Sequence, residues 1–336
     1  MVTRVAINGF GRIGRLVLRS IIESKRRDIQ VVAINDLGSV DANAMLLKYD
    51  TVHGKFPIDC KAKDGFLTVG RKTIAVTSES KPVNLPWRKL KVDVALECTG
   101  RFVDRESAAQ HLKAGAKKVL VSAPTKNADL TVVYGVNHTS LNKKHKVISN
   151  ASCTTNCLAP VAQVLHNSVG VKCGFMTTIH AFTGDQQTVD TLHSDPRRAR
   201  TASASMIPTS TGAAKAVGLV LPELAGKSDG TSIRVPTPNV SVVDLSFIAE
   251  RSTNIGEVNN AIIRASKREP LKGILGVNNE PLVSIDFNHS ALSSIFDLTQ
   301  TQVVEGNLVR AVSWHDNEWG FSNRMSDTAV ALAKAK

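Results

Sequence analysis

Aromatic residues, cysteines and long apolar runs are all scarce in this chain of 336 residues. Aromatic side chains make up 4% of it, which argues against a surface built to stack nucleic-acid bases. No apolar run approaches the ~18 residues that a membrane helix needs, so we expect no membrane span. Residues 2–8 are typical of a strand rather than of a secretory signal, and we therefore expect a cytoplasmic protein.

Five cysteines, an odd and small number, are typical of a protein from a reducing compartment. Cys153 and Cys157 are one helical turn apart, but a disulfide at that spacing has poor geometry. Cys60, Cys98 and Cys173 lie in apolar, strand-like stretches and are most simply core residues. Histidines and cysteines are not paired at the spacing of a zinc site, so we predict no metal.

The formal net charge of +13 is the strongest bias of the composition. Such a charge could indicate a nucleic-acid or membrane-surface partner. The basic residues are scattered, however, and their densest cluster, at residues 197–200, is short. We therefore favour a solvated surface with anion-binding pockets for phosphorylated ligands. Nucleic-acid or surface binding stays open as a second activity, which a steep salt dependence of RNA binding would support.

The two halves of the chain differ in their expected pattern of strands and helices. Strands alternating with helices over the first 150 residues predict a parallel sheet. After residue 153, longer strands rich in β-branched residues favour a mixed or antiparallel sheet with helices on one face. A stretch with little periodicity, residues 181–206, is expected to be a functional or interface-forming loop. The expected strands are 3–8, 31–35, 92–97, 118–121, 146–149, 171–180, 232–236, 240–247 and 308–314, with a hairpin at 67–76 and helices at 11–22, 105–114, 154–168, 213–221 and 319–336.

A glycine-rich turn follows the first predicted strand. Gly9, Gly11 and Gly14 match G-x-G-x-x-G between a strand and a helix, where glycines let a pyrophosphate approach the helix N-terminus. The second strand ends at Asp36, about 20 residues later, where a carboxylate binds ribose hydroxyls and repels a 2′-phosphate. The alternative is an ordinary strand–turn–helix. We predict an α/β protein: an NAD-binding, Rossmann-type doubly wound parallel-sheet domain, followed by an α+β catalytic domain with a mixed or antiparallel sheet.

Cys153 lies where small polar residues run into an apolar helical pattern. The free N–H groups and the dipole at a helix start favour a thiolate, which is a nucleophile. The alternative is a small buried residue, as most free cysteines are. Together with a nicotinamide cofactor, a thiolate predicts aldehyde oxidation through a thioester, which requires a general base and donors for the oxyanion. His180, at the end of an apolar strand, is the candidate base, and a structural histidine is the alternative.

Two features suit anions. Residues 209–212 are rich in hydroxyls and glycine and open a helix. Arg234 lies in an otherwise apolar strand, and a buried arginine usually has an anionic partner. The alternatives are plain helix capping and an ion pair with an acidic side chain.

Five spaced motifs together resemble the glyceraldehyde-3-phosphate dehydrogenase family, of the phosphorylating, glycolytic and bacterial-like type. They are residues 7–15 (INGFGRIGR), 149–157 (SNASCTTNC), 207–214 (IPTSTGAA), 235–240 (VPTPNV) and 314–321 (WHDNEWGF), and the match runs from residue 4 to about residue 330. The resemblance implies NAD-dependent oxidative phosphorylation of D-glyceraldehyde 3-phosphate to 1,3-bisphosphoglycerate. It makes Cys153 the nucleophile, which carries a hemithioacetal and then a thioester, and His180 the base.

The resemblance also implies binding residues, domains and assembly. It assigns NAD binding to Gly9, Gly11, Arg12, Ile13, Gly14, Asp36, Thr99, Ser122 and Asn317, the last beside the nicotinamide amide. It assigns the substrate's phosphate to Thr183 and Arg234, and the attacking inorganic phosphate to Ser152, Thr154, Arg198, Thr211 and Gly212. It implies an NAD-binding domain over residues 1–151, a catalytic domain over 152–317 and a C-terminal helix over 318–336 that packs back on the first domain. Family members are homotetramers, and residues 181–206 resemble a loop at their subunit interface.

Departures from the family pattern leave two questions open. Thr191 and Leu192 stand where many NAD-specific members have Leu-Pro, so strict exclusion of NADP is undecided. Ser80 replaces an arginine that many bacterial relatives have near the adenine. The rival function is that of erythrose-4-phosphate dehydrogenase, which the chain resembles at residues 48–54 and 284–289. An intact phosphate motif at 209–213 favours phosphorolysis of the thioester over hydrolysis.

Overall fold

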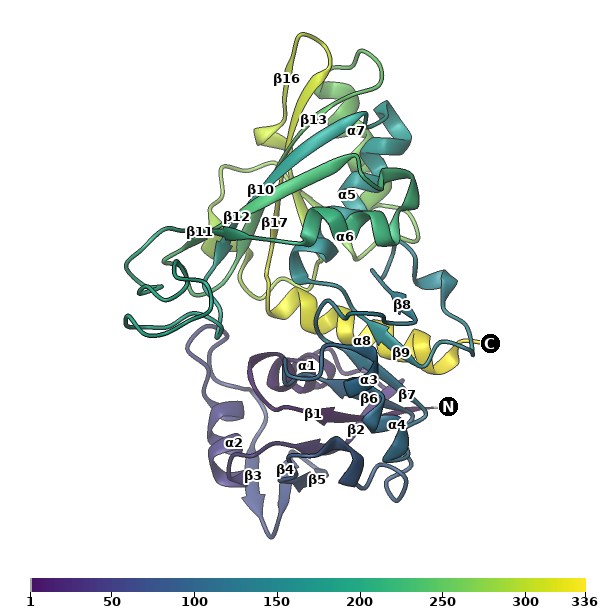
Figure 1. Cartoon of the computed structure of the whole chain (residues 1–336), viewed down its shortest axis with the longest axis vertical. Helices are drawn as coiled ribbons and strands as arrows, with labels where there is room; N and C mark the ends of the chain where they lie inside the picture. Colours follow the sequence, from purple (N-terminus) through teal and green to yellow (C-terminus); the bar gives the residue numbers. More distant parts are fainter. Residues whose placement is uncertain (1) are drawn as a thin grey trace. The chain divides into compact units, whose positions relative to one another are not determined.

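The computed structural model of the chain describes residues 2–336, which divide into two compact units. The first unit comprises residues 2–134, 138–152 and 322–336, and the second comprises residues 135–137 and 153–321. Each unit contains a large sheet (Figure 1). Across residues 2–336, no helix combines the length and the apolar character needed to cross a bilayer.

The sheet of the first unit has the strand order β3-β4-β5-β2-β1-β6-β7-β9-β8. From β5 onward all neighbours are parallel, and the run β5-β2-β1-β6-β7-β9 has the order of a doubly wound dinucleotide-binding sheet. The predicted fold class of this part of the chain is confirmed. Its strands are β1 (Thr3–Asn8), β2 (Ile29–Asn35), β3 (Cys60–Lys63), β4 (Phe66–Val69), β5 (Lys72–Thr77), β6 (Val94–Glu97), β7 (Lys118–Val121), β8 (Leu130–Thr131) and β9 (Val147–Ser149), and its helices are α1 (Arg12–Glu23), α2 (Val40–Lys48), α3 (Arg105–Ala108) and α4 (Gln110–Lys113).

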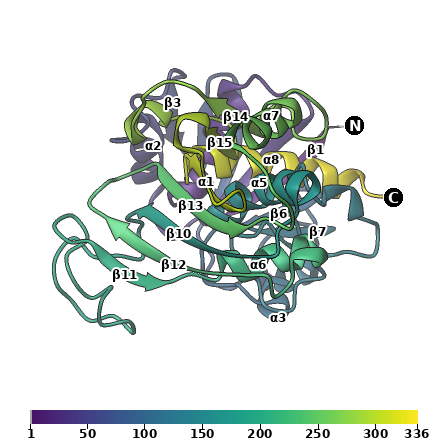
Figure 2. The ribbon, with the colours of Figure 1, turned by 90° about the horizontal axis from the view of Figure 1, so that it is seen from above.

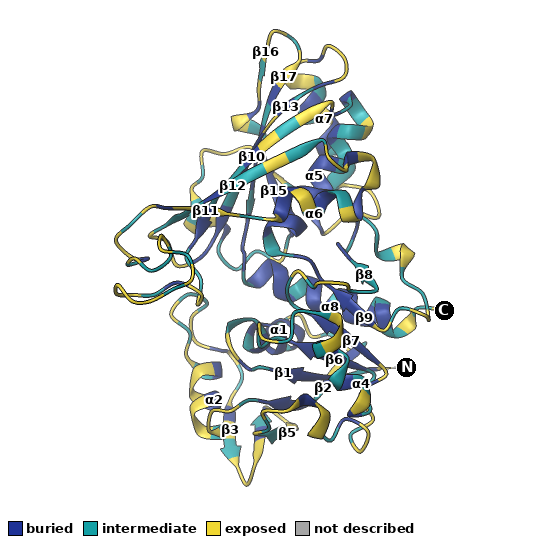
Figure 3. Cartoon of the chain, in the orientation of Figure 1, coloured by how far each residue is buried: buried dark blue, intermediate teal, exposed yellow. Residues whose placement is uncertain are grey.

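The central strands of this sheet form its core. Strands β6 and β7 are buried at every position, as parallel strands covered on both faces must be (Figure 3). Trp87 is fully buried against small residues of β1 and β6, Ala6 and Ala95. Strands β1 and β6 pair side by side in parallel, so the glycine turn after β1 and the segment after Glu97 lie at the same edge of the sheet.

Some local predictions differ from the structure. The expected hairpin is present as β4 and β5, but β5 also pairs in parallel with β2 and so belongs to the main sheet. The helix expected over residues 105–114 is divided at Ala109 into two short helices. Helix α2 and strand β3 were not predicted from the sequence.

The second unit contains a mixed sheet with the order β11-β12-β10-β13-β17-β15-β14, and β16 pairs with β17. The pairs β10–β12 and β14–β15 are parallel and the other pairs are antiparallel. Figure 2 shows β10, β12 and β13 as long neighbouring strands. The strands are β10 (Cys173–Ala181), β11 (Ile207–Ser210), β12 (Ser228–Val235), β13 (Ser241–Ile248), β14 (Leu275–Asn278), β15 (Ser294–Asp297), β16 (Gln302–Val304) and β17 (Leu308–His315), and the helices are α5 (Cys153–Val169), α6 (Ala213–Val220) and α7 (Ile255–Ser266).

Helix α5 organises this unit. It contacts β13, β15 and β17 as well as α6 and α7, so its apolar side chains join the sheet to the other helices. The predicted α+β architecture is confirmed, and the predicted long loop separates β10 from β11. The last helix, α8 (Trp319–Lys334), begins in the second unit, and residues 322–336 belong to the first. Within the first unit, Arg26 pairs with Asp327 of α8 at 2.5 Å.

All five cysteines are free thiols. Cys60 and Cys157 are buried, as a core position requires. The expectation that Cys173 is a core residue is wrong, because its side chain is exposed at the first position of β10, at the start of its pairing with Ile248.

Candidate active site

The glycine turn of the first unit leaves no room for side chains at two positions and open space at a third. Gly9 has φ +89°, and a Cβ there would lie 2.7 Å from the Thr99 backbone nitrogen. A Cβ at Gly14 would lie 2.1 Å from the Gly9 carbonyl oxygen, so α1 can approach the turn only with glycine there. A Cβ at Gly11 would meet nothing within 4 Å. The turn therefore packs tightly on its inner side and is open on its outer side, which fits close approach of a pyrophosphate.

A cavity of about 260 Å³ lies beside this turn. Four residues predicted to bind NAD line it: Gly9, Gly11, Asp36 and Thr99. Its remaining lining residues are Asn8, Asn35, Leu37, Glu79, Ser80, Cys98, Arg101 and Phe102. The other predicted NAD residues of this unit, Arg12, Ile13, Gly14 and Ser122, are not among the lining residues.

Asp36 holds the glycine turn in place. Its Oδ2 accepts a hydrogen bond from the Phe10 N–H at 2.8 Å, and its Oδ1 accepts one from the Gly38 N–H at 2.9 Å. Each carboxylate oxygen keeps a further lone pair for a ligand hydroxyl. Arg12, the first residue of α1, forms a two-pronged ion pair with Asp50, and the shorter of the two N–O distances is 2.6 Å. Asp36 is thus placed both to shape the turn and to bind a diol.

A buried network that the sequence did not reveal supports Thr99. The Glu97 carboxylate accepts hydrogen bonds from the Thr99 N–H at 2.7 Å, the Thr99 hydroxyl, and Asn8 Nδ2 at 2.6 Å. His111 Nδ1 accepts a hydrogen bond from Trp87 Nε1 at 3.0 Å, so Nε2 carries the hydrogen of the neutral ring and donates it to Glu97 at 3.0 Å. Four donors thus converge on one carboxylate and fix the cavity wall at Thr99.

The second unit brings Cys153 and His180 together. Cys153 is the first residue of α5, and His180 lies near the end of β10. Cys153 Sγ lies 3.4 Å from His180 Nε2, within hydrogen-bonding range for sulfur. On the far side of the imidazole, Nδ1 lies 2.6 Å from the Ala181 carbonyl oxygen and 2.7 Å from Arg234 Nη1. The residues predicted to be nucleophile and base are therefore in contact.

The protonation states of this pair differ from the sequence expectation. Burial raises the pKa of the Cys153 thiol, and the charge of Arg234 with hydrogen bonds at Thr154 lowers it only in part. Burial, followed by the charge of Arg234, holds the pKa of His180 well below its ordinary value. Both shifts disfavour the charged forms of the pair, because desolvation outweighs the effect of the helix start on the thiol and of the Ala181 carbonyl on the imidazole.

His180 Nδ1 faces two partners, and each suits a different tautomer. Arg234 Nη1 lies 2.7 Å away and donates, so Nδ1 can accept from it, whereas the Ala181 carbonyl lies 2.6 Å away and can accept an Nδ1–H. Arg234 Nη1 also donates to that carbonyl, at 3.1 Å. When the ring proton lies on Nδ1, Nε2 offers a lone pair to the thiol, which is what a general base needs.

Positive charge gathers around the pair. Burial lowers the pKa of Arg234, and the neighbouring charge of Arg198 lowers it further. Among residues 2–336, Arg234 Nε is buried and has no hydrogen-bond partner. Arg198 donates to Thr209 Oγ1 at 2.9 Å and pairs with Asp185. A buried guanidinium with an unused N–H beside a second guanidinium is suited to an anion.

The other residues predicted to bind phosphate lie at helix starts or in the loop after β10, and each has its own local contacts. Thr154 is buried in the first turn of α5, directly after Cys153, and Ser152 directly precedes Cys153. The Thr211 hydroxyl accepts from the Ala213 N–H at 3.2 Å, at the start of α6, and Gly212 there has open space above its Cα. Thr183 opens the loop after β10, where its carbonyl accepts from the Gln186 N–H.

Asn317 is oriented by a residue that was not predicted. Ser241 donates its hydroxyl hydrogen to Asn317 Oδ1 at 2.8 Å and accepts from the Ala181 N–H at 3.1 Å. Because the amide oxygen of Asn317 faces Ser241, its amide nitrogen points away from Ser241 and can donate to another group. Asn317 is thereby tied to the same strand end that carries His180.

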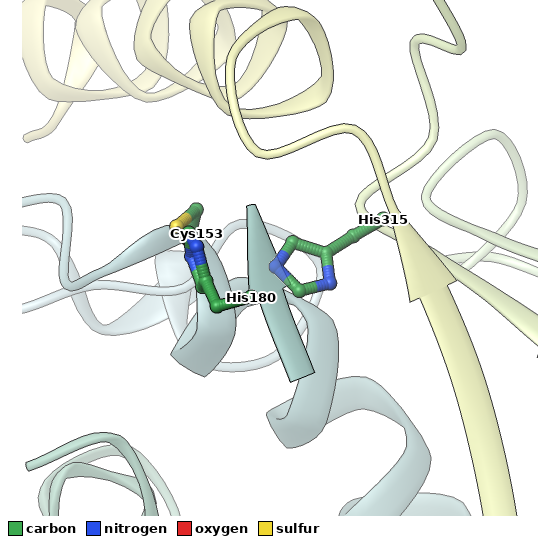
Figure 4. Close-up of side chains that lie close together, drawn as sticks. All are labelled: Cys153, His180 and His315. Carbon is green, nitrogen blue, oxygen red and sulfur yellow. Dashed lines mark hydrogen bonds between the residues drawn. The ribbon is translucent and has the colours of Figure 1, made fainter. Parts of the chain in front are cut away.

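A second histidine, His315, also lies at this pair and was not predicted. It ends β17, and its ring meets the His180 ring edge to face, with a centroid distance of 5.9 Å (Figure 4). Ligand atoms of Cys153, His180 and His315 all lie within 4.8 Å of one another. Burial lowers the pKa of His315 to about 3, so this ring is neutral at physiological pH. The motif WHDNEWGF contains His315, but sequence alone cannot show which residues it meets.

Comparison with known proteins agrees with this geometry. A family model described as "Glyceraldehyde 3-phosphate dehydrogenase, NAD binding domain" matches residues 3–105, and one described as "Glyceraldehyde 3-phosphate dehydrogenase, C-terminal domain" matches residues 152–317. The chain belongs to the glyceraldehyde-3-phosphate dehydrogenase family. It is 66% identical to the glyceraldehyde-3-phosphate dehydrogenase of Xanthobacter flavus over 334 residues, covering 99% of both chains. The corresponding proteins of Cereibacter sphaeroides and Geobacillus stearothermophilus are 63% and 54% identical, each over 99% of both chains.

Membership of the glyceraldehyde-3-phosphate dehydrogenase family confirms the predicted resemblance along the whole chain. Both matched segments contain predicted site residues: the glycine turn and Asp36 in the first, and Cys153, His180 and Arg234 in the second. The comparisons support the glyceraldehyde 3-phosphate dehydrogenase assignment and not the erythrose-4-phosphate alternative.

Proposed function

We propose that the chain oxidises D-glyceraldehyde 3-phosphate with NAD and releases the acyl group to inorganic phosphate as 1,3-bisphosphoglycerate. The chain is an NAD-dependent dehydrogenase of this family. The observation that carries the proposal is the contact of Cys153 Sγ with His180 Nε2 at 3.4 Å, beside the buried guanidinium of Arg234.

Cys153 and His180 act first. His180 Nε2 accepts the thiol proton as Sγ attacks the aldehyde carbon, so the thiolate forms only when it is used. We propose that backbone N–H groups at the start of α5 donate to the developing oxyanion. Ala181 holds the imidazole by its carbonyl, which stabilises the ring as it gains a proton. We propose that His180 gives this proton to the oxyanion, which forms the neutral hemithioacetal, and takes it back as the C–H hydride is lost to the acceptor, which leaves a thioester on Cys153.

NAD supplies the hydride acceptor when it is bound. We propose that Gly9, Gly11, Arg12, Ile13 and Gly14 hold its pyrophosphate, that Asp36 binds a ribose diol, and that Thr99, Ser122 and Asn317 make further contacts. The open space above Gly11 and the free lone pairs of Asp36 support these roles.

Two anions are held separately in this proposal. Thr183 and Arg234 bind the phosphate of the aldehyde. Ser152, Thr154, Arg198, Thr211 and Gly212 bind the inorganic phosphate that cleaves the thioester. The unused Nε of Arg234 and the open turn at Gly212 support the assignment. Arg198 must exchange its partner Asp185, at least in part, for the incoming anion.

We further propose functional domains over residues 1–151, 152–317 and 318–336, and a homotetramer in which residues 181–206 line a subunit interface. Five free cysteines support a reducing, cytoplasmic location. The exposed side chain of Leu192 in this loop, 98% accessible in the single chain, is the strongest support for a covered surface there.

The test is NADH formation from D-glyceraldehyde 3-phosphate and NAD, with and without inorganic phosphate. We expect sustained turnover only with phosphate or arsenate, since either anion can cleave the thioester. Phosphate-independent production of the acid would contradict the proposal, as would faster turnover of erythrose 4-phosphate under the same conditions.

A further inference from the structure

His315 is unusual among the buried residues of the second unit. It is 1% exposed, and neither of its ring nitrogens has a hydrogen-bond partner among residues 2–336. A buried histidine normally has at least one partner, because an unsatisfied ring nitrogen costs free energy on burial. His180, its neighbour, has partners on both ring nitrogens. The lone pair of His315 is therefore available to a ligand that approaches the pair.

We propose that Cys153, His180 and His315 form a binding site for a soft divalent cation, with Zn²⁺ as the representative ion. Two histidines and a cysteine are a ligand set that zinc uses, with the fourth position left to water. The three residues come from the start of α5, the end of β10 and the end of β17 (Figure 4). Their separation along the sequence hides the set from any search for spaced motifs.

The distances suit a tetrahedral ion. Zn–S of about 2.3 Å and Zn–N of about 2.0–2.1 Å place tetrahedral ligand atoms roughly 3.3–3.6 Å apart. Cys153 Sγ and His180 Nε2 are 3.4 Å apart, and all three ligand atoms lie within 4.8 Å of one another. Closure by about 1 Å, through rotation of the His315 ring, therefore brings the third ligand into range.

The outer contacts of His180 also suit a metal ligand. A histidine that binds a metal through one nitrogen usually donates the other N–H to a carboxylate or a carbonyl. Here Nδ1 faces the Ala181 carbonyl at 2.6 Å, which leaves Nε2 for the ion. Arg234 lies on the Nδ1 side, and its charge weakens binding of a cation without occupying the position. The site is accordingly a reversible one rather than a tight structural one.

Binding breaks the S–H bond of Cys153, forms a Zn–S bond and releases the proton to the buffer, with no change in oxidation state. The ion then occupies both the thiol and the lone pair of His180. Inhibition of the dehydrogenase follows from the proposed function, whereas zinc binding itself does not depend on it.

The test is equilibrium dialysis of the reduced full-length chain against ZnCl₂, with Co²⁺ as a spectroscopic probe. We expect a zinc ion per chain that is lost in Cys153→Ser, and a thiolate-to-cobalt charge-transfer band with the absorption of a tetrahedral ion. Removing a residue that only hydrogen-bonds to a metal ligand weakens metal binding by about 10–100-fold. Removing the ligand His315 itself, by His315→Gln or His315→Phe, should therefore weaken zinc binding at least about tenfold. Two matched controls, Cys173→Ser and His145→Gln, should leave binding unchanged.

Two outcomes would overturn the proposal: zinc affinity in both His315 variants equal to that of the unmodified chain, or tight zinc retained in Cys153→Ser. Circular dichroism establishes that each variant is folded, and the alkylation rate of Cys153 is a second check for the variants that keep this thiol. As a second readout, the zinc concentration that halves dehydrogenase activity should rise in the His315 variants by the same factor as the dissociation constant, and EDTA should restore activity.

Discussion

Replacing Glu97 by Gln tests whether the wall of the glycine-turn cavity is held by an acceptor-only carboxylate. Four donors face Glu97, two from Thr99 and one each from Asn8 and His111. A glutamine side chain keeps one acceptor oxygen and turns an NH₂ group toward two donors. The Asn8 amide cannot reverse to compensate, because its Oδ1 already accepts from Asn35 Nδ2 at 2.7 Å. At least two charged hydrogen bonds are therefore lost.

The expected cost follows from that count. A hydrogen bond to a charged group contributes about 1.5–3 kcal/mol, so losing two costs on the order of 3–6 kcal/mol. A folded protein has only about 5–15 kcal/mol of stability in total. We therefore expect a large fall in the urea midpoint of the first unit. NAD affinity should fall as well, because Thr99 lines the cavity.

The assay is urea unfolding of the full chain, followed by circular dichroism with and without NAD. Glu106→Gln is the matched control, since Glu106 is exposed on α3 and the substitution makes the same change in charge. An exposed change of this kind is worth about 0.5 kcal/mol or less. A loss in Glu97→Gln no larger than that of the control would refute the argument that the four donors require a carboxylate.

Four further predictions concern the reaction. Alkylation of Cys153 by iodoacetamide in the NAD-free protein should still be rising at about pH 9, since the raised pKa leaves little thiolate below the ordinary value of about 8.5. His180→Asn should slow acylation by about a hundredfold or more in single-turnover experiments. The same substitution should hardly shift the pH profile of Cys153 alkylation, because a neutral imidazole gives the thiolate no charge partner. A large shift of that profile would mean that the imidazole is charged. Asp36→Ala should raise the Kd for NAD at least about tenfold and narrow the NAD to NADP ratio of kcat/KM, because the diol contact is lost together with the charged hydrogen bonds from Phe10 in the glycine turn and from Gly38. An unchanged ratio would place cofactor discrimination elsewhere. Thr211→Ala should raise the KM for inorganic phosphate much more than the KM for the aldehyde, because losing a hydrogen-bond donor to a buried anion costs roughly 1–3 kcal/mol of binding free energy. Equal changes in the two KM values would contradict separate anion sites.

Much of the fold could be predicted because its signals are local. Residues 3–8 and 118–121 are apolar runs of strand length, and they match β1 and β7 at both ends. Helix α2 gave a weak signal because Met45 and Leu46 are exposed, so its apolar residues do not form one face. Helix α7 was missed although its cap was visible: the Asn254 side chain accepts from the Glu257 N–H at 3.0 Å, a spacing that marks helix starts.

The candidate site was predictable in identity but not in electrostatics. The position of Cys153 at a helix start could be derived from the sequence around it. Its raised pKa could not, because burial depends on packing between elements far apart in the chain. The same holds for His315, which reaches Cys153 only through the pairing of β17 with β13 and of β13 with β10. Sequence reasoning singled out Cys153 and His180, which lie in contact, and missed the surroundings that shift their pKa values.

The division of the chain has a consequence for its synthesis on the ribosome. The first compact unit includes residues 322–336, so the NAD-binding half lacks the segment from α8 until those residues have been synthesised. At about 5–20 residues per second, the ribosome needs on the order of ten seconds or more to pass from residue 152 to residue 336. During that interval the nascent half-domain exposes the apolar surface that Met325, Ala329 and Leu332 of α8 later cover, since all three are buried in the finished fold. A nascent chain of this kind is a natural client for ribosome-associated chaperones, and a fragment ending at residue 151 should aggregate unless the C-terminal helix is supplied as a separate peptide.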